Sequence, residues 1–330
     1  DLLVIGGGIN GAGIARDAAG RGLSVLLVEQ DDLASATSQW STKLIHGGLR
    51  YLEYYEFRLV GEALAEREVM LAIAPHLVQP LAFVLPHEPH LRPAWMIRIG
   101  LFLYDHLGRR VTLPGSFGVK LPGSKWAAGL KPRFKKGFVY ADARVDDARL
   151  VIANVLDAQA KGADIRVRTR LTGARRDGGL WTMTLAGPDG MSSDVQTRAI
   201  VNAAGPWVKE VLESVHPIIA DEGNVRHVKG SHIVVPRVHG EPHAYILQNA
   251  DNRIVFVIPY QDAYSLIGTT DVPVKDFDRP EISDDEVEYL LKLANAYLEQ
   301  PLARKDVVWT YSGVRPLYDD GKSDPSAITR

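Results

Sequence analysis

Three glycines near the start of the chain, Gly6, Gly8 and Gly11, have the spacing of a phosphate-binding turn. They follow an apolar run at residues 2–5 that predicts a strand, and they precede an Ala-rich stretch at 12–21 that predicts a helix. In such a turn the first glycine permits a tight bend, the second lets a diphosphate approach the backbone, and the third lets the helix pack on the strand. The N–H groups at the helix N-terminus then face the phosphates.

Glu29 ends a second predicted strand at residues 23–28 and lies 18 residues after Gly11. A carboxylate at this place can accept a hydrogen bond from a ribose hydroxyl, and it would repel a 2′-phosphate. The motif and Glu29 together therefore indicate a dinucleotide site that disfavours NADP. The alternative is a glycine-rich turn that holds no ligand.

The run from Ser35 to Arg50, SATSQWSTKLIHGGLR, resembles the flavin-facing loop of the D-amino-acid-oxidase-like flavoprotein superfamily. Gly47 and Gly48 would let the backbone lie close to a flat isoalloxazine ring, where a β-carbon would clash. Ser41, Thr42 and Lys43 could donate hydrogen bonds to phosphate or ring oxygens. This run favours FAD over NAD, and the alternative reading is a polar surface loop.

Further strings extend the resemblance along the whole chain to the FAD-dependent sn-glycerol-3-phosphate dehydrogenases of the respiratory, aerobic kind, which reduce quinone. The strings are IGGGINGAGIARDAAGRG, STKLIHGGLRYLE, EFRLVGEALAEREV, LRPAWMIRIGLFLYDHLG, VDDARL, VNAAGPW, KGSHIVVPR, IGTTD and WTYSGVRPL. The resemblance implies a longer family chain that completes the flavin domain and adds a helical C-terminal region.

The resemblance also implies a set of residues that contact FAD. They are Gly6, Gly8, Asn10, Gly11, Glu29, Gln30, Thr37, Ser41, Thr42, Lys43, His46, Gly47, Gly48, Leu49, Ala204 and Gly205.

A phosphate-bearing substrate needs fixed cationic donors, and an arginine side chain offers a planar pair of them. Arg50 and Arg315 match family positions associated with the substrate at the flavin face, and Tyr51 could add a hydroxyl. Lys229 is a further phosphate candidate. The alternative for each arginine is a surface salt bridge.

Oxidation of the C2 alcohol needs a hydride acceptor, which a flavin supplies at N5, and a proton acceptor, which the protein supplies. His232 is the first candidate base and His46 the second. Thr270 and Asp271, with Thr269, could bind the substrate or orient the base. The catalytic set is thus predicted to be His232, Arg315 and Arg50.

The predicted reaction is the oxidation of sn-glycerol 3-phosphate to dihydroxyacetone phosphate, with a membrane quinone as electron acceptor. The alternatives are a glycerol-phosphate oxidase that uses oxygen, an amine or amino-acid oxidase, and a non-enzymatic nucleotide-binding protein. Attachment of FAD through a histidine stays open. Attachment through cysteine is excluded for these 330 residues, because they contain none.

The amino-acid composition limits the kinds of partner that the chain can bind. Lys and Arg number 38 against 40 Asp and Glu, a formal charge of −2, so the sequence predicts no nucleic-acid partner. The absence of cysteine rules out disulfides and zinc–thiolate sites within the chain, and no metal site is predicted. We expect neither a secretory signal nor a spanning segment. Both ends look cut, and we also expect a cytoplasmic location and a homodimer.

A basic segment suggests contact with an anionic membrane. Between Arg109 and Lys136 there are eight Lys or Arg residues and no acidic ones, with Phe117, Trp126 and Phe134 among them. The apolar helix predicted at 94–107 lies just before. Residues 94–136 therefore form a candidate contact with the inner face of the cytoplasmic membrane, through which quinone would reach the flavin. The alternative is a solvated loop beside a buried helix.

The order of elements predicts an α/β protein: a Rossmann-like FAD-binding domain with an inserted α+β substrate domain built on an antiparallel sheet. The FAD-binding domain is expected at 1–75, 140–215 and 305–330, incomplete at its C-terminal end, and the substrate domain at 76–139 and 216–304. Helices are predicted at 57–73, 94–107, 146–160 and 283–297. Later strands are predicted at 165–169, 180–185, 200–204, 232–236, 244–248, 253–259, 264–268 and 307–311.

Overall fold

A computed structural model describes the chain except residues 89–91, 109, 217–224, 250–252 and 320–330, so Arg109 of the basic segment lies outside the described residues. Within the described part, a parallel sheet has the strand order β11-β1-β2-β7. Its strands are β1 (Leu2–Ile5), β2 (Val25–Val28), β7 (Asp164–Arg166) and β11 (Ala199–Asn202). The strand–turn–helix–strand unit predicted at the start of the chain is confirmed.

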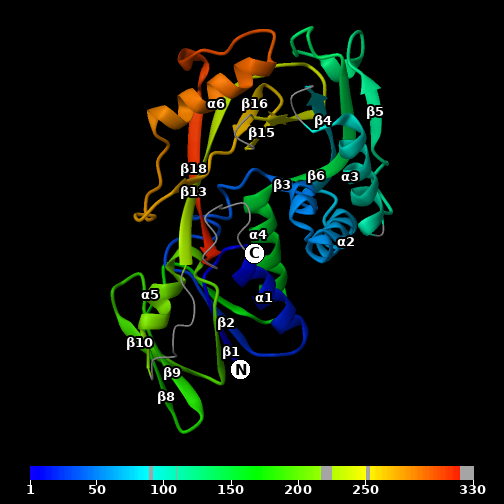
Figure 1. Ribbon diagram of the computed structural model, residues 1–330. Helices are drawn as coiled ribbons and strands as arrows, with labels where there is room; N and C mark the ends of the chain where they lie inside the picture. The colour runs from blue at the N-terminus through cyan, green and yellow to red at the C-terminus, as the bar shows by residue number, and fades with distance from the viewer. Residues whose placement is uncertain (89–91, 109, 217–224, 250–252, 320–330) are drawn as a thin grey trace.

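Two helices cover one face of this sheet: α1 (Ile9–Gly20) and α4 (Asp147–Ala160) (Figure 1). Their contact consists of small side chains, and Ala15 and Ala158 are completely buried in the same apolar cluster. Small residues let the two helices and the sheet approach closely. The side chain of Asp146 caps α4 by accepting a hydrogen bond from the N–H of Arg149.

A second four-stranded sheet covers the other face, with strand order β10-β9-β8-β12. It packs Leu171, Met183 and Leu185 against Leu3 and Val28. Its strands are β8 (Arg170–Asp177), β9 (Leu180–Ala186), β10 (Ser192–Thr197) and β12 (Val215–His216), and the turn η3 (Gly205–Trp207) and helix α5 (Val208–Glu213) lie between β11 and β12. The sequence predicted only β9 of these four strands.

The remaining strands form one large sheet, in the order β17-β13-β16-β15-β14-β4-β6-β3, with β18 beside β13 and β5 beside β6. The fold class is confirmed, and among the described strands of this sheet one pair, β4 with β14, is parallel rather than antiparallel. The strands are β3 (Leu44–Ile45), β4 (Val78–His87), β5 (Phe117–Lys120), β6 (Lys136–Val145), β13 (Val225–Pro236), β14 (Ala244–Gln248), β15 (Ile254–Tyr260), β16 (Tyr264–Gly268), β17 (Val272–Pro273) and β18 (Trp309–Tyr318).

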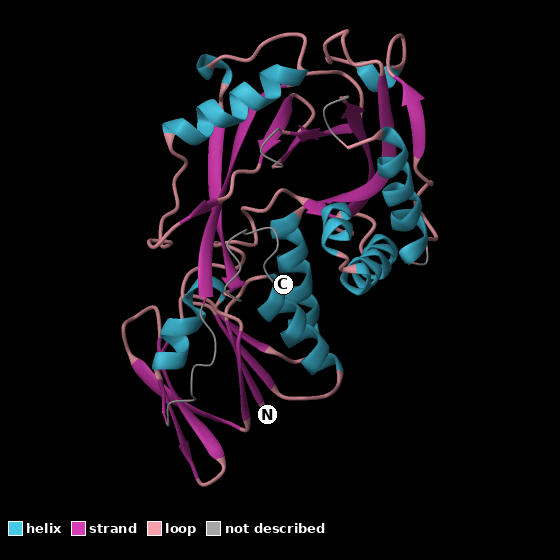
Figure 2. Ribbon diagram, in the orientation of Figure 1, coloured by secondary structure: helices cyan, strands magenta, loops and turns pink. Residues whose placement is uncertain are grey.

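Helices cover both faces of the large sheet, as Figure 2 shows. Helix α6 (Asp284–Tyr297) packs on the face that carries Ile233 and Val235, whereas α2 (Phe57–Ile73) and α3 (Ala94–Leu107) share a cluster with Val234. This alternation is the period-2 pattern of a strand buried on both sides. Short turns complete the fold: η1 (Leu49–Tyr54), η2 (Lys125–Ala127) and η4 (Arg304–Asp306).

Strands β4 and β6 were not predicted, and β18 is longer than predicted. Pro80 and Pro86 in β4 disfavour a strand in the sequence, but both lie beyond the two residues, Phe83 and Val84, at which β14 pairs with β4. A proline is tolerated where its missing N–H faces no partner strand. The predicted domain boundaries cut β6 at residue 140 and separate β18 from β13, with which it pairs along its whole length. The division into domains stays a prediction.

A buried polar network attaches α6 to the large sheet. Glu286, in the first turn of α6, accepts hydrogen bonds from Ser231 and Thr270 at 2.8 and 2.7 Å and pairs with the Lys229 ammonium at 2.8 Å. It also forms a capping box with Ser283 at the start of α6. Burial acts to raise the pKa of Glu286, but the hydrogen bonds, above all from Lys229, hold it below its usual value. Glu286 is therefore charged at neutral pH.

We expect Glu286→Ala to lower the free energy of unfolding by about 3–5 kcal/mol, because it leaves Lys229 buried without a counter-charge. Asp285→Ala removes the neighbouring exposed carboxylate and should change stability by less than about 1 kcal/mol. Chemical denaturation followed by circular dichroism measures both. Equal stability of the two variants would contradict the proposed role of the network.

Candidate functional site

A cavity of about 400 Å³ lies at the carboxyl ends of β1 and β2, where the glycine turn meets α1. Ligands of doubly wound sheets bind at this edge. Predicted FAD-contacting residues from four separate stretches of the chain line it: Gly6, Gly8, Asn10, Glu29, Gln30, Thr37, Ala204 and Gly205. The structure therefore brings these residues together around one space large enough for part of a dinucleotide.

Gly11 lies just behind the cavity, where α1 packs on the turn. A β-carbon at Gly11 would be 1.9 Å from the carbonyl oxygen of Gly6, and Gly6 itself has a φ of +110°. The predicted reasons for these two glycines thus agree with the geometry. The first N–H of α1, at Ile9, donates to the Ser38 hydroxyl at 2.9 Å. Ser38 was not predicted, although an unpaired N–H at a helix start is a reason to search nearby loops for an acceptor.

Glu29 lies on the wall of the cavity, with its carboxylate held by the backbone. It accepts hydrogen bonds from the N–H groups of Gly7 and Asp31 at 2.7 and 2.8 Å. Burial raises the pKa of Glu29 above its usual value, although these hydrogen bonds act against the change. Each carboxylate oxygen has a further lone pair, so a ribose hydroxyl can still be accepted.

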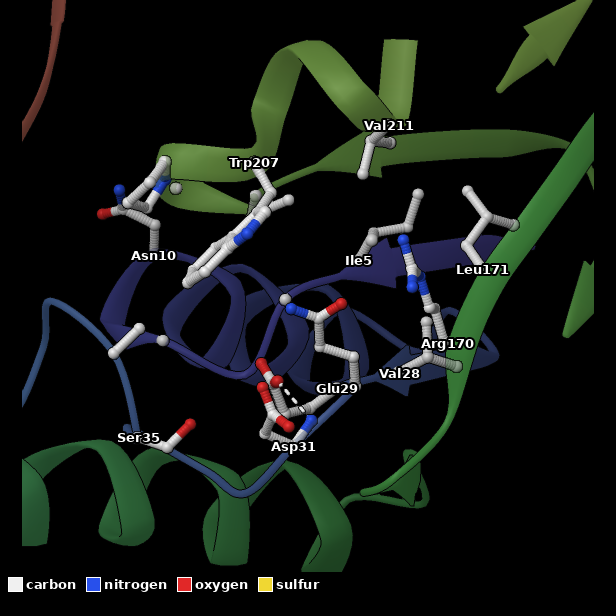
Figure 3. Close-up of a pocket in the computed structure, with 18 of the residues that line it drawn as sticks. Ile5, Asn10, Val28, Glu29, Asp31, Ser35, Arg170, Leu171, Trp207 and Val211 are labelled. Atoms are coloured by element: carbon white, nitrogen blue, oxygen red, sulfur yellow. Dashed lines mark hydrogen bonds between the residues drawn. The ribbon is translucent and has the colours of Figure 1, made fainter. Parts of the chain in front are cut away.

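Trp207 and Arg170 are among the lining residues that were not selected from the sequence. Figure 3 shows Trp207 over the cavity, opposite Glu29 and Asp31. The Trp207 indole N–H donates to Asp278 at 2.9 Å, which ties the η3 turn to the segment after β17. Trp207 could have been found from its place after Gly205-Pro206, but no sequence motif marks Arg170.

The loop at residues 35–43 leads from the cavity to the predicted catalytic residues, because it is hydrogen-bonded along β18 and β13. Thr37 donates to the carbonyl of Val314 at 2.6 Å, and the Tyr311 hydroxyl donates to the carbonyl of Ser41 at 2.8 Å. The Thr42 hydroxyl lies 3.0 Å from Nε2 of His232. Residues that lie about 190 and 270 positions apart in the sequence thus meet where this loop passes the neighbouring strands β13 and β18.

His232 is almost completely buried on β13, with its ring stacked on Tyr311 at a centroid distance of 4.7 Å. Its Nδ1 atom is buried and has no hydrogen-bond partner within the described residues. Burial, followed by the charges of Arg315 and Lys43, lowers the pKa of His232 to about 3. The imidazole is therefore neutral at pH 7 and has a lone pair available.

Arg315 lies on β18 beside the residues that follow β16. Its Nη1 atom donates to Asp271 at 2.5 Å, and its Nη2 atom donates to Thr269 at 3.2 Å. A β-carbon on Gly230 of the neighbouring strand would be 2.4 Å from Nη2, so the glycine makes room for the guanidinium. The Arg315 side chain keeps 27% of its surface exposed, so an anion can reach it.

Ser41 and Lys43 have partners other than a ligand. The Ser41 hydroxyl donates to Asp147 at 2.7 Å, and the Lys43 ammonium contacts the same carboxylate at 2.8 Å. Asp147 opens α4, so these bonds fix the loop to the helix that covers the parallel sheet. Asp147 was not predicted as part of the site.

Two other predicted substrate residues, Lys229 and Thr270, are engaged in the Glu286 network. Lys229 is 9% exposed and Thr270 is 1% exposed, and their polar atoms contact Glu286. A buried ion pair already neutralises the Lys229 charge. The Lys229 side chain therefore holds α6 on the sheet in this structure rather than facing a phosphate.

The other predicted residues, His46 to Tyr51, lie in a turn and in η1, beside α2 and α3. Arg50 lies in η1, whereas Arg315 lies on β18. His46 packs near Phe256 of β15, with ring centroids 6.5 Å apart. The structure thus places Arg50 and Arg315 on different elements, and their joint role stays a prediction.

Gly47 and Gly48 are required by packing within the protein. A β-carbon on Gly47 would lie 2.4 Å from Leu64 and 2.8 Å from the Tyr104 hydroxyl, and one on Gly48 would lie 2.3 Å from the Tyr51 ring. From the sequence, both glycines were expected to let the backbone lie close to a flavin. The neighbouring side chains already explain them.

Two further features concern metals and membranes. Among the described residues, no cluster of three or more His, Asp or Glu side chains could hold a metal ion. None of the described helices combines the length and the apolar character needed to cross a bilayer.

Comparison with known proteins gives consistent matches. Residues 1–327 match the family described as FAD dependent oxidoreductase (DAO). The chain is 59% identical to the aerobic glycerol-3-phosphate dehydrogenase of Escherichia coli K12 and 52% identical to the D-erythritol 1-phosphate dehydrogenase of Brucella abortus 2308. Each match covers 100% of this chain and 66% of the relative, so the chain spans slightly less than two thirds of these proteins.

A solved structure supports the same assignment. The glycerol-3-phosphate dehydrogenase from Bacillus halodurans, in complex with FAD, superposes with a TM-score of 0.75 at 29% identity, over 99% of this chain and 59% of that one. The match to the family model over almost the entire length, together with a dinucleotide cavity built around the glycine turn, shows that this chain belongs to the FAD-dependent oxidoreductases of the DAO family.

Proposed function

We propose that the protein oxidises sn-glycerol 3-phosphate to dihydroxyacetone phosphate, using FAD bound in the cavity at the glycine turn. The observation that carries this proposal is the hydrogen-bonded path of loop 35–43, which connects that cavity to a neutral histidine and an accessible arginine. The identity of 59% to an aerobic glycerol-3-phosphate dehydrogenase supports the choice of substrate.

The cavity fits a dinucleotide, because backbone N–H groups of a helix N-terminus and a carboxylate line it and a β-carbon at Gly11 would close the turn. When bound, FAD supplies a hydride acceptor at N5. Arg315 would hold the substrate phosphate through guanidinium N–H groups that Asp271 and Thr269 leave free. Asp271 orients this guanidinium, and Arg50 is the proposed second cation.

His232 is the proposed acceptor of the C2 hydroxyl proton, with Thr42 orienting its Nε2 atom. A pKa of about 3 makes it a weak base in the protein without substrate. Part of this depression comes from the charge of Arg315. A phosphate dianion on Arg315 would cancel that charge and raise the pKa of His232, so substrate binding itself would strengthen the base.

We further propose that electrons pass to a membrane quinone and that α3 lies on the membrane surface. One face of α3 is apolar and exposed, at Trp95 (63% exposed), Ile99 (52%) and Phe102 (53%), with Met96 and Leu103 beside them. Exposed aromatic and aliphatic side chains at this helical spacing are typical of helices that lie in a bilayer interface. The expected cytoplasmic location and homodimer stay predictions.

The basic residues contribute less to this surface than the sequence suggested. Lys131 and Arg133 donate to the carbonyls of Asn295 and Ala296 at the end of α6, at 2.5 and 2.9 Å. Cations at a helix C-terminus stabilise its free carbonyl groups. The apolar face of α3, rather than the whole of the basic segment, is therefore the main proposed contact.

A second candidate substrate is a longer polyol phosphate, because a relative 52% identical to this chain is named for D-erythritol 1-phosphate. Both substrates offer a phosphate and a secondary alcohol, so the same residues would serve. Anaerobic reduction of the flavin by each compound separates the two. Peroxide formation in air would instead favour the oxidase alternative, and reduction by amino acids would favour an amino-acid oxidase.

We expect Gly11→Ala to reduce the affinity of the intact protein for FAD by at least about tenfold, because the added methyl displaces the turn from α1. Gly13→Ala in the same helix is the control, since a β-carbon there meets nothing within 4 Å. Titration of the apoprotein with FAD, followed by flavin fluorescence, measures both affinities. Gly11→Ala with the affinity of Gly13→Ala would remove the glycine turn from the FAD site.

The substrate assignment is tested by adding sn-glycerol 3-phosphate without air and recording the flavin absorbance, which should bleach. Arg315→Ala should lower kcat/KM about 100-fold, equivalent to about 2.7 kcal/mol, with unchanged FAD content. Arg304→Ala, which breaks an exposed pair with Asp284, should leave kcat/KM unchanged. Absence of bleaching in the unmodified protein would refute the substrate, and normal kcat/KM in Arg315→Ala would refute the anchor.

The membrane proposal predicts that Ile99→Glu with Phe102→Glu lowers binding to vesicles containing phosphatidylglycerol at least about tenfold, because two carboxylates replace the inserted side chains. Met191→Glu is the control, because Met191 is 70% exposed in the turn between β9 and β10, far from α3 along the chain. Vesicle sedimentation measures the bound fraction. Unchanged binding of the double variant would place the contact elsewhere.

A further inference from the structure

The hydroxyl of Tyr104 connects the turn at residues 46–48 to two helices and a strand. Tyr104 lies on the buried face of α3, and its hydroxyl accepts a hydrogen bond from the N–H of Gly47 at 2.7 Å. The same hydroxyl donates to the carboxylate of Asp142 on β6, which lies 2.9 Å away. Asp142 in turn accepts a hydrogen bond from Arg67 of α2 at 2.5 Å.

These three side chains are all buried: Arg67 is 4% exposed, Tyr104 is 3% exposed and Asp142 is 2% exposed. Burial raises the pKa of Asp142 above its usual value, and the charge of Arg67 acts against this rise, which favours the carboxylate form that accepts the hydrogen bond from Tyr104. The lone pairs of the Tyr104 oxygen then remain to accept the hydrogen bond from the Gly47 N–H. Burial, and then the charge of Asp142, raise the pKa of Tyr104 well above its usual value, so the hydroxyl keeps its proton.

The turn itself has little freedom. Leu64 and the Tyr104 hydroxyl fill the space where a β-carbon of Gly47 would lie, and Gly48 has a left-handed φ of +70°. The N–H of Gly48 donates to Nδ1 of His46 at 3.0 Å. A buried backbone N–H without a partner is costly, so the Gly47 N–H keeps the turn against Tyr104.

We propose that Tyr104 is a positioning residue for the flavin-facing turn: its hydroxyl, held by Asp142 and Arg67, sets where residues 46–48 stand against the FAD ring. This inference rests on the proposed function and on the expectation, from the resemblance of residues 35–50 to a flavin-facing loop, that this turn faces the flavin. Tyr104 would act through Gly47 and would touch neither the substrate nor the cofactor.

Tyr104 also links the turn to an exposed apolar surface. Its helix, α3, carries Trp95, Ile99 and Phe102 on the opposite, exposed face. The turn is therefore hydrogen-bonded to the helix that is proposed to lie on the membrane. A displacement of α3 would reach residues 46–48 through the hydrogen bond from the Gly47 N–H to the Tyr104 hydroxyl.

The test is Tyr104→Phe in the intact holoprotein, because this change removes one oxygen and keeps the ring. Tyr140→Phe is the matched control: Tyr140 is equally buried (3% exposed) and packs edge-on against Tyr104, but the N–H of Gly47 donates to Tyr104 and not to Tyr140. The melting temperature of each variant monitors folding. The informative readouts are the visible spectrum of the bound flavin and its midpoint potential, obtained by titration with dithionite against a reference dye.

We expect Tyr104→Phe to shift the flavin spectrum and potential, and Tyr140→Phe to leave both at their original values. With sn-glycerol 3-phosphate, kcat should fall about tenfold in Tyr104→Phe, with KM within about twofold, because the turn moves and the phosphate anchor does not. A Tyr104→Phe protein that loses thermal stability but keeps the original spectrum, potential and kcat would show a structural role only and would overturn the proposal.

The dithionite titration needs no substrate, so it separates this inference from the proposed reaction. If glycerol 3-phosphate fails to reduce the flavin, the reaction is wrong, and the titration of Tyr104→Phe still decides the role of the hydroxyl. If the reaction is correct and the two tyrosine variants behave alike, the positioning role alone is refuted.

Discussion

The attachment of loop 35–43 to strand β18 is the contact on which the arrangement of the site depends. The loop begins at the cavity formed by the parallel sheet and ends at the large sheet, and hydrogen bonds from Thr37, Thr42 and Tyr311 fix it between them. Other contacts, such as that of Trp207 with Asp278, also join the cavity to the large sheet, but this loop is the segment that runs from the cavity to His232. The short loop 35–43 therefore runs from the glycine turn to the buried imidazole of His232.

Buried charges in the molecule are paired, and the pairs differ in what they leave available. Lys229 with Glu286, and Arg67 with Asp142, are almost completely enclosed and hold helices on the large sheet. Arg315 with Asp271 keeps about 30% of each side chain exposed, so the guanidinium is oriented and still open to an anion. A fully buried ion pair has no room for a third partner, so it can only stabilise the fold. A partly exposed pair can also bind a ligand.

Local patterns were enough to predict the parts of the fold whose signals lie within a few residues. The glycine turn and the helices at 57–73, 94–107 and 283–297 were placed within a residue or two. Strands β4 and β6 were missed, because prolines in β4 oppose a strand locally while its pairing with distant residues forms one. The partners with which a strand pairs lie far away along the chain, so the strand propensity of a short stretch of residues does not reveal them.

The sequence by itself determined the chemistry on offer: a dinucleotide turn, a carboxylate at the end of β2, an arginine on a strand and a histidine beside it. Only the tertiary structure decided which of these groups are free to act. It paired Lys229 with Glu286, turned Lys43 toward Asp147 and left Nδ1 of His232 without a partner in the described residues. The reason is physical: residue type sets what a side chain can donate or accept, whereas burial and the nearest opposite charge, both contributed by remote segments, set whether it still can.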